Sequence, residues 1–189
     1  MKRKKMRSKL FGKMTEMDVL EFDVTDRSKW RMLFEKWATL NRELKEYGGR
    51  GLTFPEGLSE VAFCLLTGSV KKLSTPQGVT ASFDTYNPTS KKAQQIKAST
   101  IYDDLTSFGP KSKWDELYFM DFYNDGIHDG SFDLYLISNE LIYGHKVNKD
   151  QTLIMQQQQG KRPRVSLKKN VISKHGIMPL YEKVKTWEI

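Results

Sequence analysis

The sequence predicts one domain of the α/β or α+β class, and three observations support that prediction. The chain has 189 residues, close to the length of one domain, and 38% of them are hydrophobic, which is enough for a substantial core. Helical periodicity fills the first third of the chain, and strand-like segments separated by turn residues fill the middle. Helices followed by a run of strands form a layered domain around a central sheet.

The first helix is expected over residues 26–47. Asp26 or Ser28 can serve as its N-cap, and Gly48 follows its end. Its apolar side chains recur at helical spacing and should form the buried face: Trp30, Leu33, Phe34, Trp37, Leu40 and Leu44.

A second helix is expected to begin near Thr53, because Thr53 and Glu56 have the spacing of a capping box. It should end at Gly68. Residues 61–66 are apolar on every side, which predicts that this half of the helix is buried. They include the single cysteine, Cys64, which we interpret as a small buried hydrophobic residue.

Strand-like segments come next, at residues 79–86, 93–101, 117–123 and 131–137. A further short strand is expected over residues 141–143, and a helix over residues 149–159. Beyond Pro163, residues 165–172 suit either a last strand or a last helix.

The net charge of +8 is unevenly distributed along the chain. Residues 1–13 hold seven basic side chains and no acid, and residues 151–181 hold six with no acid, whereas residues 14–150 carry a net charge of −5. Basic flanks attract phosphates, and an acidic centre can bind a metal. We therefore separate a basic extension, residues 1–25, from one domain, residues 26–189; a merely solvated tail is the alternative for the extension.

One group of residues in the middle of the chain fits together chemically. If the strands that contain Asp84 and Gln95 pair as a hairpin, Asp84 lies beside Gln95 and Lys97, which share a strand face, while Ile96 points to the other face. Carboxylate and amide oxygens can hold Mg²⁺, and a lysine beside them can position and activate a water molecule. This chemistry suits the hydrolysis of a phosphodiester bond.

A third oxygen ligand would complete the site, and Glu60 is the best candidate. It lies in a helix that otherwise looks buried, where an unpaired carboxylate would be unfavourable unless a metal neutralised it. Glu56 lies on the same helix face, but its expected capping role already accounts for it.

These residues resemble the motif of the PD-(D/E)XK nuclease superfamily, in which an acid on one strand precedes an acid-X-Lys on the next. Asp84 matches the first acid, Lys97 the lysine and Glu60 the helical acid. Gln95 replaces the second acid, and Phe83 stands where the motif has proline. The resemblance implies a core with a central mixed β-sheet flanked by helices.

The likeness extends over about residues 28–175. Blocks that resemble a small family of type II restriction endonucleases, which cut the palindrome GC-N-GC, lie at residues 49–51, 54–60, 95–98, 104–110, 114–117, 129–133 and 160–164. It implies a Mg²⁺-dependent homodimer that cleaves double-stranded DNA. It also implies a restriction-modification system with a cognate DNA methyltransferase as genetic partner. A cytoplasmic location is expected separately, because the sequence shows neither an apolar membrane span nor a secretory signal.

On this resemblance Asp84, Gln95 and Glu60 are the candidate metal ligands, and Lys97 joins them as a catalytic residue. Arg162 and Arg164, which alternate around Pro163, are candidates for reading guanine, with phosphate contact as the alternative. The remaining candidates for phosphate contact are Lys161, Lys168 and Lys169.

Other interpretations have less support. The three histidines show no metal-binding spacing, and Asp121 and Asp133 lie inside apolar strands, where a structural role is favoured over an auxiliary catalytic one. A non-enzymatic DNA-binding regulator would need a helix-turn-helix pattern, which we do not find, and a nuclease of another specificity or with a repair role is a further alternative. The sequence has no apolar run of membrane-spanning length and no signal peptide.

Overall fold

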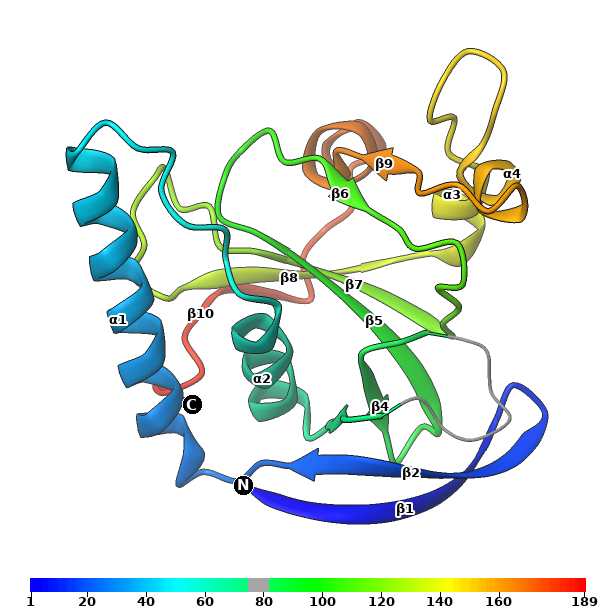
Figure 1. Ribbon diagram of the computed structural model, residues 1–189, viewed down its shortest axis with the longest axis horizontal. Coiled ribbons are helices and arrows are strands. Elements are labelled where there is room, and N and C mark those ends of the chain that lie inside the picture. Colours follow the sequence, from blue (N-terminus) through cyan, green and yellow to red (C-terminus); the bar gives the residue numbers. More distant parts are fainter. Residues whose placement is uncertain (75–81) are drawn as a thin grey trace.

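The computed structural model describes residues 1–74 and 82–189. In these residues eight strands form one sheet in the order β1-β2-β3-β4-β5-β7-β8-β10, and a second sheet contains β6 and β9 (Figure 1). Neighbouring strands are antiparallel except β5 and β7, which are parallel. The strands are β1 (Lys2–Leu10), β2 (Lys13–Glu21), β3 (Val70–Lys72), β4 (Thr85–Asn87), β5 (Lys92–Ser99), β6 (Thr106–Ser107), β7 (Glu116–Asp121), β8 (Phe132–Ile137), β9 (Arg164–Val165) and β10 (Tyr181–Val184). The predicted α/β class with a mixed central sheet is confirmed.

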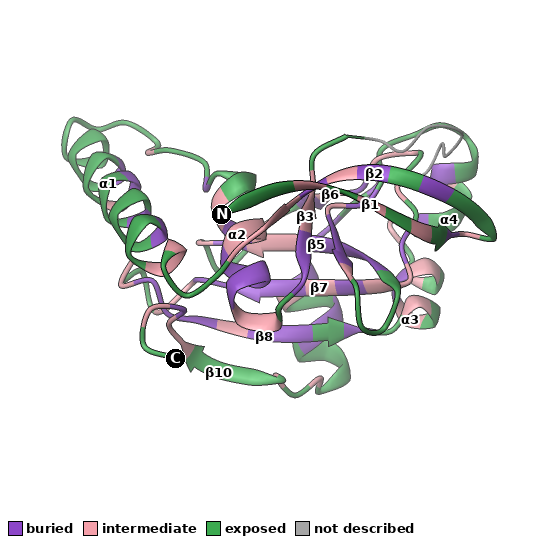
Figure 2. Cartoon of the chain, turned by 90° about the horizontal axis from the view of Figure 1, so that it is seen from below, coloured by how far each residue is buried: buried purple, intermediate pink, exposed green. Residues whose placement is uncertain are grey.

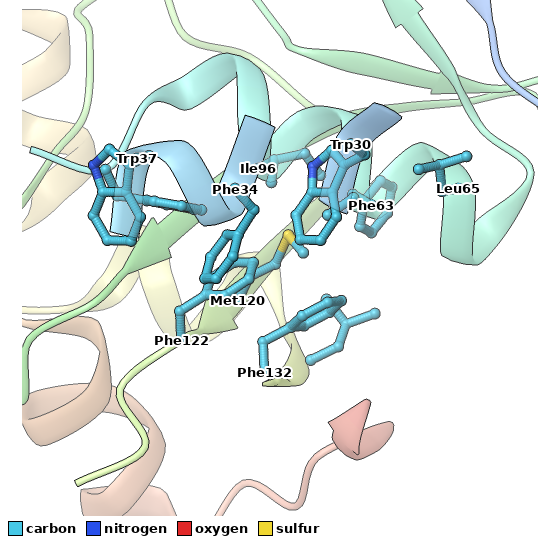
Figure 3. Packing of buried hydrophobic residues seen from close by; sticks show 12 residues of the cluster. Trp30, Phe34, Trp37, Phe63, Leu65, Ile96, Met120, Phe122 and Phe132 are labelled. Atoms are coloured by element: carbon cyan, nitrogen blue, oxygen red, sulfur yellow. The ribbon is translucent and has the colours of Figure 1, made fainter. Parts of the chain in front are cut away.

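Helices α1 (Asp26–Glu46) and α2 (Glu56–Thr67) cover one face of the sheet. Their aromatic side chains pack onto the strands, as Figure 3 shows for Phe34 of α1 beside Phe122. The ring of Phe63 of α2 lies 4.8 Å, centre to centre, from that of Tyr118 of β7. The rings of Phe54 and Phe122 lie 4.6 Å apart, centre to centre. Burial of large aromatic rings is the main force that fixes both helices to the sheet.

The opposite face of the sheet carries a second core. It contains Phe119 and Tyr135 from the sheet together with Val165 and Ile172 from the C-terminal part of the chain. The covering elements are α3 (Asn139–Gly144), α4 (Leu153–Gln158) and the π-helical turn η1 (Lys168–Ser173). None of the helices in residues 1–74 and 82–189 has the length and hydropathy of a membrane span.

The first 25 residues contribute to the main sheet. Strands β1 and β2 pair along their whole length as a hairpin, from Lys2 opposite Glu21 to Leu10 opposite Lys13, and β2 joins β3. Met17 and Val19 of β2 are buried in a third small core. The segment that the sequence presents as an extension is therefore an ordered edge of the sheet.

Several boundaries differ from those expected. Residues 141–143 belong to α3, because the Ser138 side chain accepts the amide hydrogen of Leu141 and starts a helix. Helix α2 begins at Glu56 with Pro55 as N-cap and no side-chain cap, so the expected capping box does not form. Part of the strand expected over residues 79–86 lies outside the described residues.

The buried line of α1 is narrower than expected. Trp30, Phe34 and Trp37 are buried as predicted, with Asn41 continuing the line. The three leucines of the expected face are not buried, and their exposed fractions lie between 37 and 49%: Leu33, Leu40 and Leu44. Figure 2 shows the exposed outer side of α1, whereas the central strands β5 and β7 are largely buried.

Candidate active site

The candidate site forms where β4 begins, because the part of β5 beyond Gln94 has no β4 residue opposite it. On its β5 side, strand β4 covers only the first residues of β5, from Asn87 opposite Lys92 to Thr85 opposite Gln94. Asp84 lies just before β4, and its Oδ2 accepts the amide hydrogen of Ile96 with an N–O distance of 2.8 Å. The Asp84 carboxylate thus accepts the hydrogen bond from Ile96 that a backbone carbonyl of a longer β4 would have accepted. This short strand explains why an acid can lie at the middle of the sheet.

Gln95 lies next to Asp84, as the predicted hairpin requires. Its Nε2 donates a hydrogen bond to Asp84 Oδ2. Its Oε1 is buried and has no hydrogen-bond partner among the described residues. A buried carbonyl oxygen without a partner is unfavourable, so Gln95 Oε1 is available to a metal ion or an ordered water.

Lys97 shares the Gln95 face of β5, and Ile96 points into the opposite core, as predicted. The Lys97 ammonium lies 5.4 Å from the centre of the Phe108 ring and is close enough to Asp84 for its charge to act on that carboxylate. Lys97 also lines a cavity of about 440 Å³. Lys97 therefore connects the buried Asp84 carboxylate and Gln95 amide to the wall of a solvent-accessible cavity.

The cavity lies between the loop that joins α1 to α2 and the segment from β5 to β6. Asn41 of α1 holds the first loop, because its Oδ1 accepts the amide hydrogen of Leu52 at 2.7 Å. Gly51 adopts a φ of +74°, and a Cβ there would lie 2.4 Å from Asn41 Oδ1. This close approach explains both the buried asparagine and the glycine.

Two acids of α2 approach the site. Glu60 pairs with Lys71 of β3, so the carboxylate that looked unpaired in the sequence already has a cation. Glu56 makes no cap, lines the cavity, and its charge acts on both Asp84 and Lys71. The structure therefore links Glu60 to the candidate site through Lys71, and it brings Glu56, which the expected capping box had set aside, to the cavity wall.

Burial raises the pKa of Asp84 above that of an ordinary aspartate. The amide of Ile96 and the charges of Lys97 and Lys72 oppose that shift, and the charge of Glu56 adds to it. A carboxylate that is destabilised as an anion gains from a nearby divalent cation. The electrostatics of Asp84 therefore favour metal binding.

Three polar residues near the site had no role in the sequence analysis. Lys71 and Lys72 of β3 both sense the charge of Asp84, and burial lowers the pKa of each. Asp104 lines the cavity and accepts a hydrogen bond from Thr106 Oγ1 at 3.2 Å. Two adjacent lysines on a short strand resemble an ordinary solvated surface in the sequence, so nothing there distinguishes them.

The basic segment that contains Arg162 and Arg164 lies beside the cavity. Strand β9 pairs with β6, with Arg164 opposite Ser107, and the amide of Phe108 donates to the carbonyl of Pro163 at 2.9 Å. Both arginines are exposed on either side of the buried Pro163. Neither arginine forms an ion pair with any residue in the described parts of the chain. They are free to contact an anion outside the protein.

The other predicted phosphate contacts divide into two kinds. Lys161 is exposed, and Lys169 forms only a loose surface pair with Asp103 at 3.7 Å. The Lys168 ammonium instead lies 2.6 Å from Oδ2 of the nearly buried Asp121 and donates a hydrogen bond to the Tyr135 hydroxyl. Lys168 and Asp121 thus attach η1 to the sheet, which supports the structural interpretation of Asp121.

No three His, Cys, Asp or Glu side chains form a metal-binding group in residues 1–74 and 82–189. The candidate ligand set is different: two carboxylates, of Asp84 and Glu60, and the free amide oxygen of Gln95. Oxygen ligands of this kind suit a hard cation such as Mg²⁺. The residues at the site therefore fit the metal, with water molecules expected to complete its coordination.

Comparison with known proteins identifies the family. The family model of the Bsp6I restriction endonuclease matches residues 22–174, most of the chain. The chain belongs to this family. It is also 33% identical over 149 residues to the type II restriction enzyme Bsp6I of Bacillus sp. (strain RFL6), covering 76% of this chain and 79% of that enzyme. No solved structure matches the chain.

Family membership confirms the resemblance seen in the sequence. The chain is a type II restriction endonuclease, an enzyme that hydrolyses DNA at a specific sequence. DNA is its substrate, and enzymes of this type use divalent metal ions as a class. All four predicted catalytic residues lie within the matched region.

Proposed function

We propose that this endonuclease cleaves both strands of DNA with Mg²⁺ held by Asp84, Gln95 and Glu60. The observation that carries the proposal is the buried, unpartnered Oε1 of Gln95 beside the carboxylate of Asp84. When bound, the metal would stabilise the charge that develops on the phosphate and lower the pKa of a water ligand.

The protein's own residues account for the rest of the reaction. Lys97 lines the cavity, and we assign its ammonium the roles of orienting the attacking water and offsetting negative charge on the phosphate. Asp84 is fixed by the amide of Ile96, so the backbone of β5 would orient this carboxylate toward a bound metal. Glu56, at the cavity wall, is placed to bind water next to the metal.

We propose GC-N-GC as the target and Arg162 and Arg164 as the residues that read it. The target rests on the blocks of sequence that resemble the GC-N-GC family. Arginine to guanine in the major groove is the commonest specific contact to DNA. Both side chains are exposed at the strand that adjoins the cavity, and Lys161 and Lys169 beside them suit phosphates.

A palindromic target calls for a homodimer with two-fold symmetry. We propose that α1 forms the interface through the exposed side chains of Leu33, Leu40 and Leu44. Lys36 and Glu43 flank Leu40 and have no ion-pair partner in the part of the chain that the structure describes. In an antiparallel pair of α1 helices centred near Leu40, Lys36 of each copy faces Glu43 of the other.

The dimer proposal is tested by Leu40→Glu, which should convert a dimer to a monomer in light scattering at matched concentration. Met178→Glu is the control, because Met178 is 75% exposed and lies outside α1. A dimer that survives Leu40→Glu would place the interface elsewhere.

The biological setting follows from the substrate. An enzyme that cuts unmodified DNA endangers its host unless the same sites are methylated, so we propose a cognate DNA methyltransferase as its genetic partner. We propose the cytoplasm as the place of action, because the DNA to be cleaved is there.

Digestion of a plasmid of known sequence tests the function. With Mg²⁺ we expect discrete fragments whose ends all fall at GC-N-GC, and with EDTA we expect no cleavage. Fragment ends at another sequence would overturn the target, and a smear or intact plasmid would overturn the specific Mg²⁺-dependent cleavage. The same plasmid carrying methylated sites should remain intact.

A further inference from the structure

Lys71 contacts Glu60, one of the carboxylates proposed above as metal ligands. It belongs to β3, beneath α2, and its side chain is only 21% exposed. Its ammonium contacts Glu60 Oε2, and the Glu60 side chain is 12% exposed. A cation in contact with a poorly solvated carboxylate stabilises that carboxylate, and this is also the expected role of the metal.

Two further carboxylates act on the same ammonium. The charges of Asp84 and Glu56 both favour protonated Lys71, while burial disfavours it and on balance lowers its pKa. The three acids that surround the candidate metal site therefore already share one internal cation. A divalent ion that bound Glu60 and Asp84 would meet this ammonium at close range, and like charges repel strongly where water is scarce.

We propose that Lys71 competes with the metal: it holds Glu60 in the metal-free enzyme and must release it before the ion is fully coordinated. This inference rests on the proposed function, because it takes Asp84 and Glu60 as metal ligands. It assigns Lys71 the role of a positioning residue that acts through Glu60.

The competition has a consequence for substrate binding. A DNA phosphate bound beside Asp84 would be an alternative partner for the released ammonium, because Lys71 already senses the charge of Asp84. Binding of DNA therefore frees Glu60, and metal and DNA strengthen each other's binding by the same factor. The enzyme then binds its metal firmly only when DNA is in place.

Lys72 offers a matched control. It is the next residue of β3, it also senses the charge of Asp84, and removing it deletes the same charge. Its ammonium lies 4.6 Å from the centre of the Phe83 ring, and no ion pair with an acid joins it to the described residues. Any difference between the effects of substituting the two lysines on Mg²⁺ affinity therefore reports the contact of Lys71 with Glu60.

The experiment is calorimetric titration of the full-length protein with Mg²⁺ in the absence of DNA. We expect Lys71→Met to tighten Mg²⁺ binding about tenfold, because the competing ion pair is gone, and Lys72→Met to tighten it about twofold through charge alone. Equal effects of the two substitutions, or weaker binding by Lys71→Met, would overturn the inference. If Lys71→Met does not fold, as judged by thermal unfolding, Lys71→Gln serves in its place with the same expectation.

Asp84→Asn separates this inference from the proposed site. Loss of Mg²⁺ binding in Asp84→Asn without tightening in Lys71→Met would leave the site standing and reject the role of Lys71. Unchanged Mg²⁺ binding in Asp84→Asn would reject the site itself. The titration is then repeated with Ca²⁺ in the presence of duplex DNA. DNA should raise the metal affinity of Lys71→Met by a smaller factor than it raises that of the wild type. An equal factor for the two proteins would also overturn the inference.

Discussion

The two basic segments of this chain look alike in the sequence but differ in the structure. In the N-terminal hairpin four of the six cations of β1 pair with acids on β2, among them Lys5 and Arg7, each 3.2 Å from Glu16, and Lys4, 2.7 Å from Glu21. In the C-terminal segment Arg162 and Arg164 are exposed, without acid partners among the described residues, and β9, which contains Arg164, pairs with β6 at the cavity wall.

The difference shows that a run of like charges does not define a DNA-binding surface by itself. Charges that are already paired on a sheet gain little from a phosphate, because exchanging one anion for another is nearly neutral. Unpaired charges at the cavity gain the full interaction and also lie where the target must be read. We therefore expect the C-terminal segment to determine specific binding and the hairpin to contribute little.

The largest effect is expected from the double substitution Arg162→Ala/Arg164→Ala. Each bidentate contact to guanine is worth about 1–3 kcal/mol, so specific affinity for GC-N-GC should fall about 1,000-fold while affinity for unrelated DNA falls far less. Competition binding with both duplexes measures the ratio. An equal loss on both duplexes would show that the arginines contact phosphates only.

A smaller effect, on stability, separates two adjacent lysines of the same segment. Lys168→Met leaves the nearly buried Asp121 without its cation and should lower the free energy of unfolding by about 2 kcal/mol. Lys169→Met removes only the exposed ion pair with Asp103 and should change the free energy of unfolding by less than about 0.5 kcal/mol. Urea denaturation compares them, and equal stabilities would contradict the assignment of Lys168 to the core.

The smallest effect is expected from the hairpin. Alternate residues of β1 are exposed, so the set to be replaced by serine is Arg3, Lys5, Arg7 and Lys9. We expect affinity for DNA to fall less than about tenfold and the salt dependence to flatten slightly, with an unchanged cleavage site. The control replaces the exposed Lys146 and Lys149. A changed cleavage site would mean that the hairpin reads bases.

Substitution is the right test for this segment, since deletion of residues 1–13 would remove β1 and expose the edge of β2. An exposed edge strand promotes aggregation, and loss of the buried Leu10 would weaken the third core. A truncation would then report folding as well as charge.

Residue patterns predicted the parts of the fold that depend on local periodicity. They gave α1, the buried half of α2, and the hairpin that sets Asp84 beside Gln95, because a short hairpin brings together residues that are close in sequence. The burial of Cys64 also follows from its apolar neighbours.

Long-range contacts account for what the sequence could not predict. Glu60 looked unpaired because its cation, Lys71, comes from β3, and nothing in the sequence places β3 beneath α2. The hairpin of residues 2–21 begins with four consecutive basic residues, so its charge obscured its strand pattern. Lys168 looked like its neighbours because Asp121 lies far from it along the chain.

The most direct test of the account is single-turnover cleavage by Lys97→Ala on a duplex with one GC-N-GC site, with equilibrium binding measured in Ca²⁺ on the same duplex. The account predicts cleavage at least about 100-fold slower than in the wild type, with DNA affinity within about threefold. Cleavage within tenfold of the wild-type rate would contradict the placement of the active site at the part of β5 beyond Gln94.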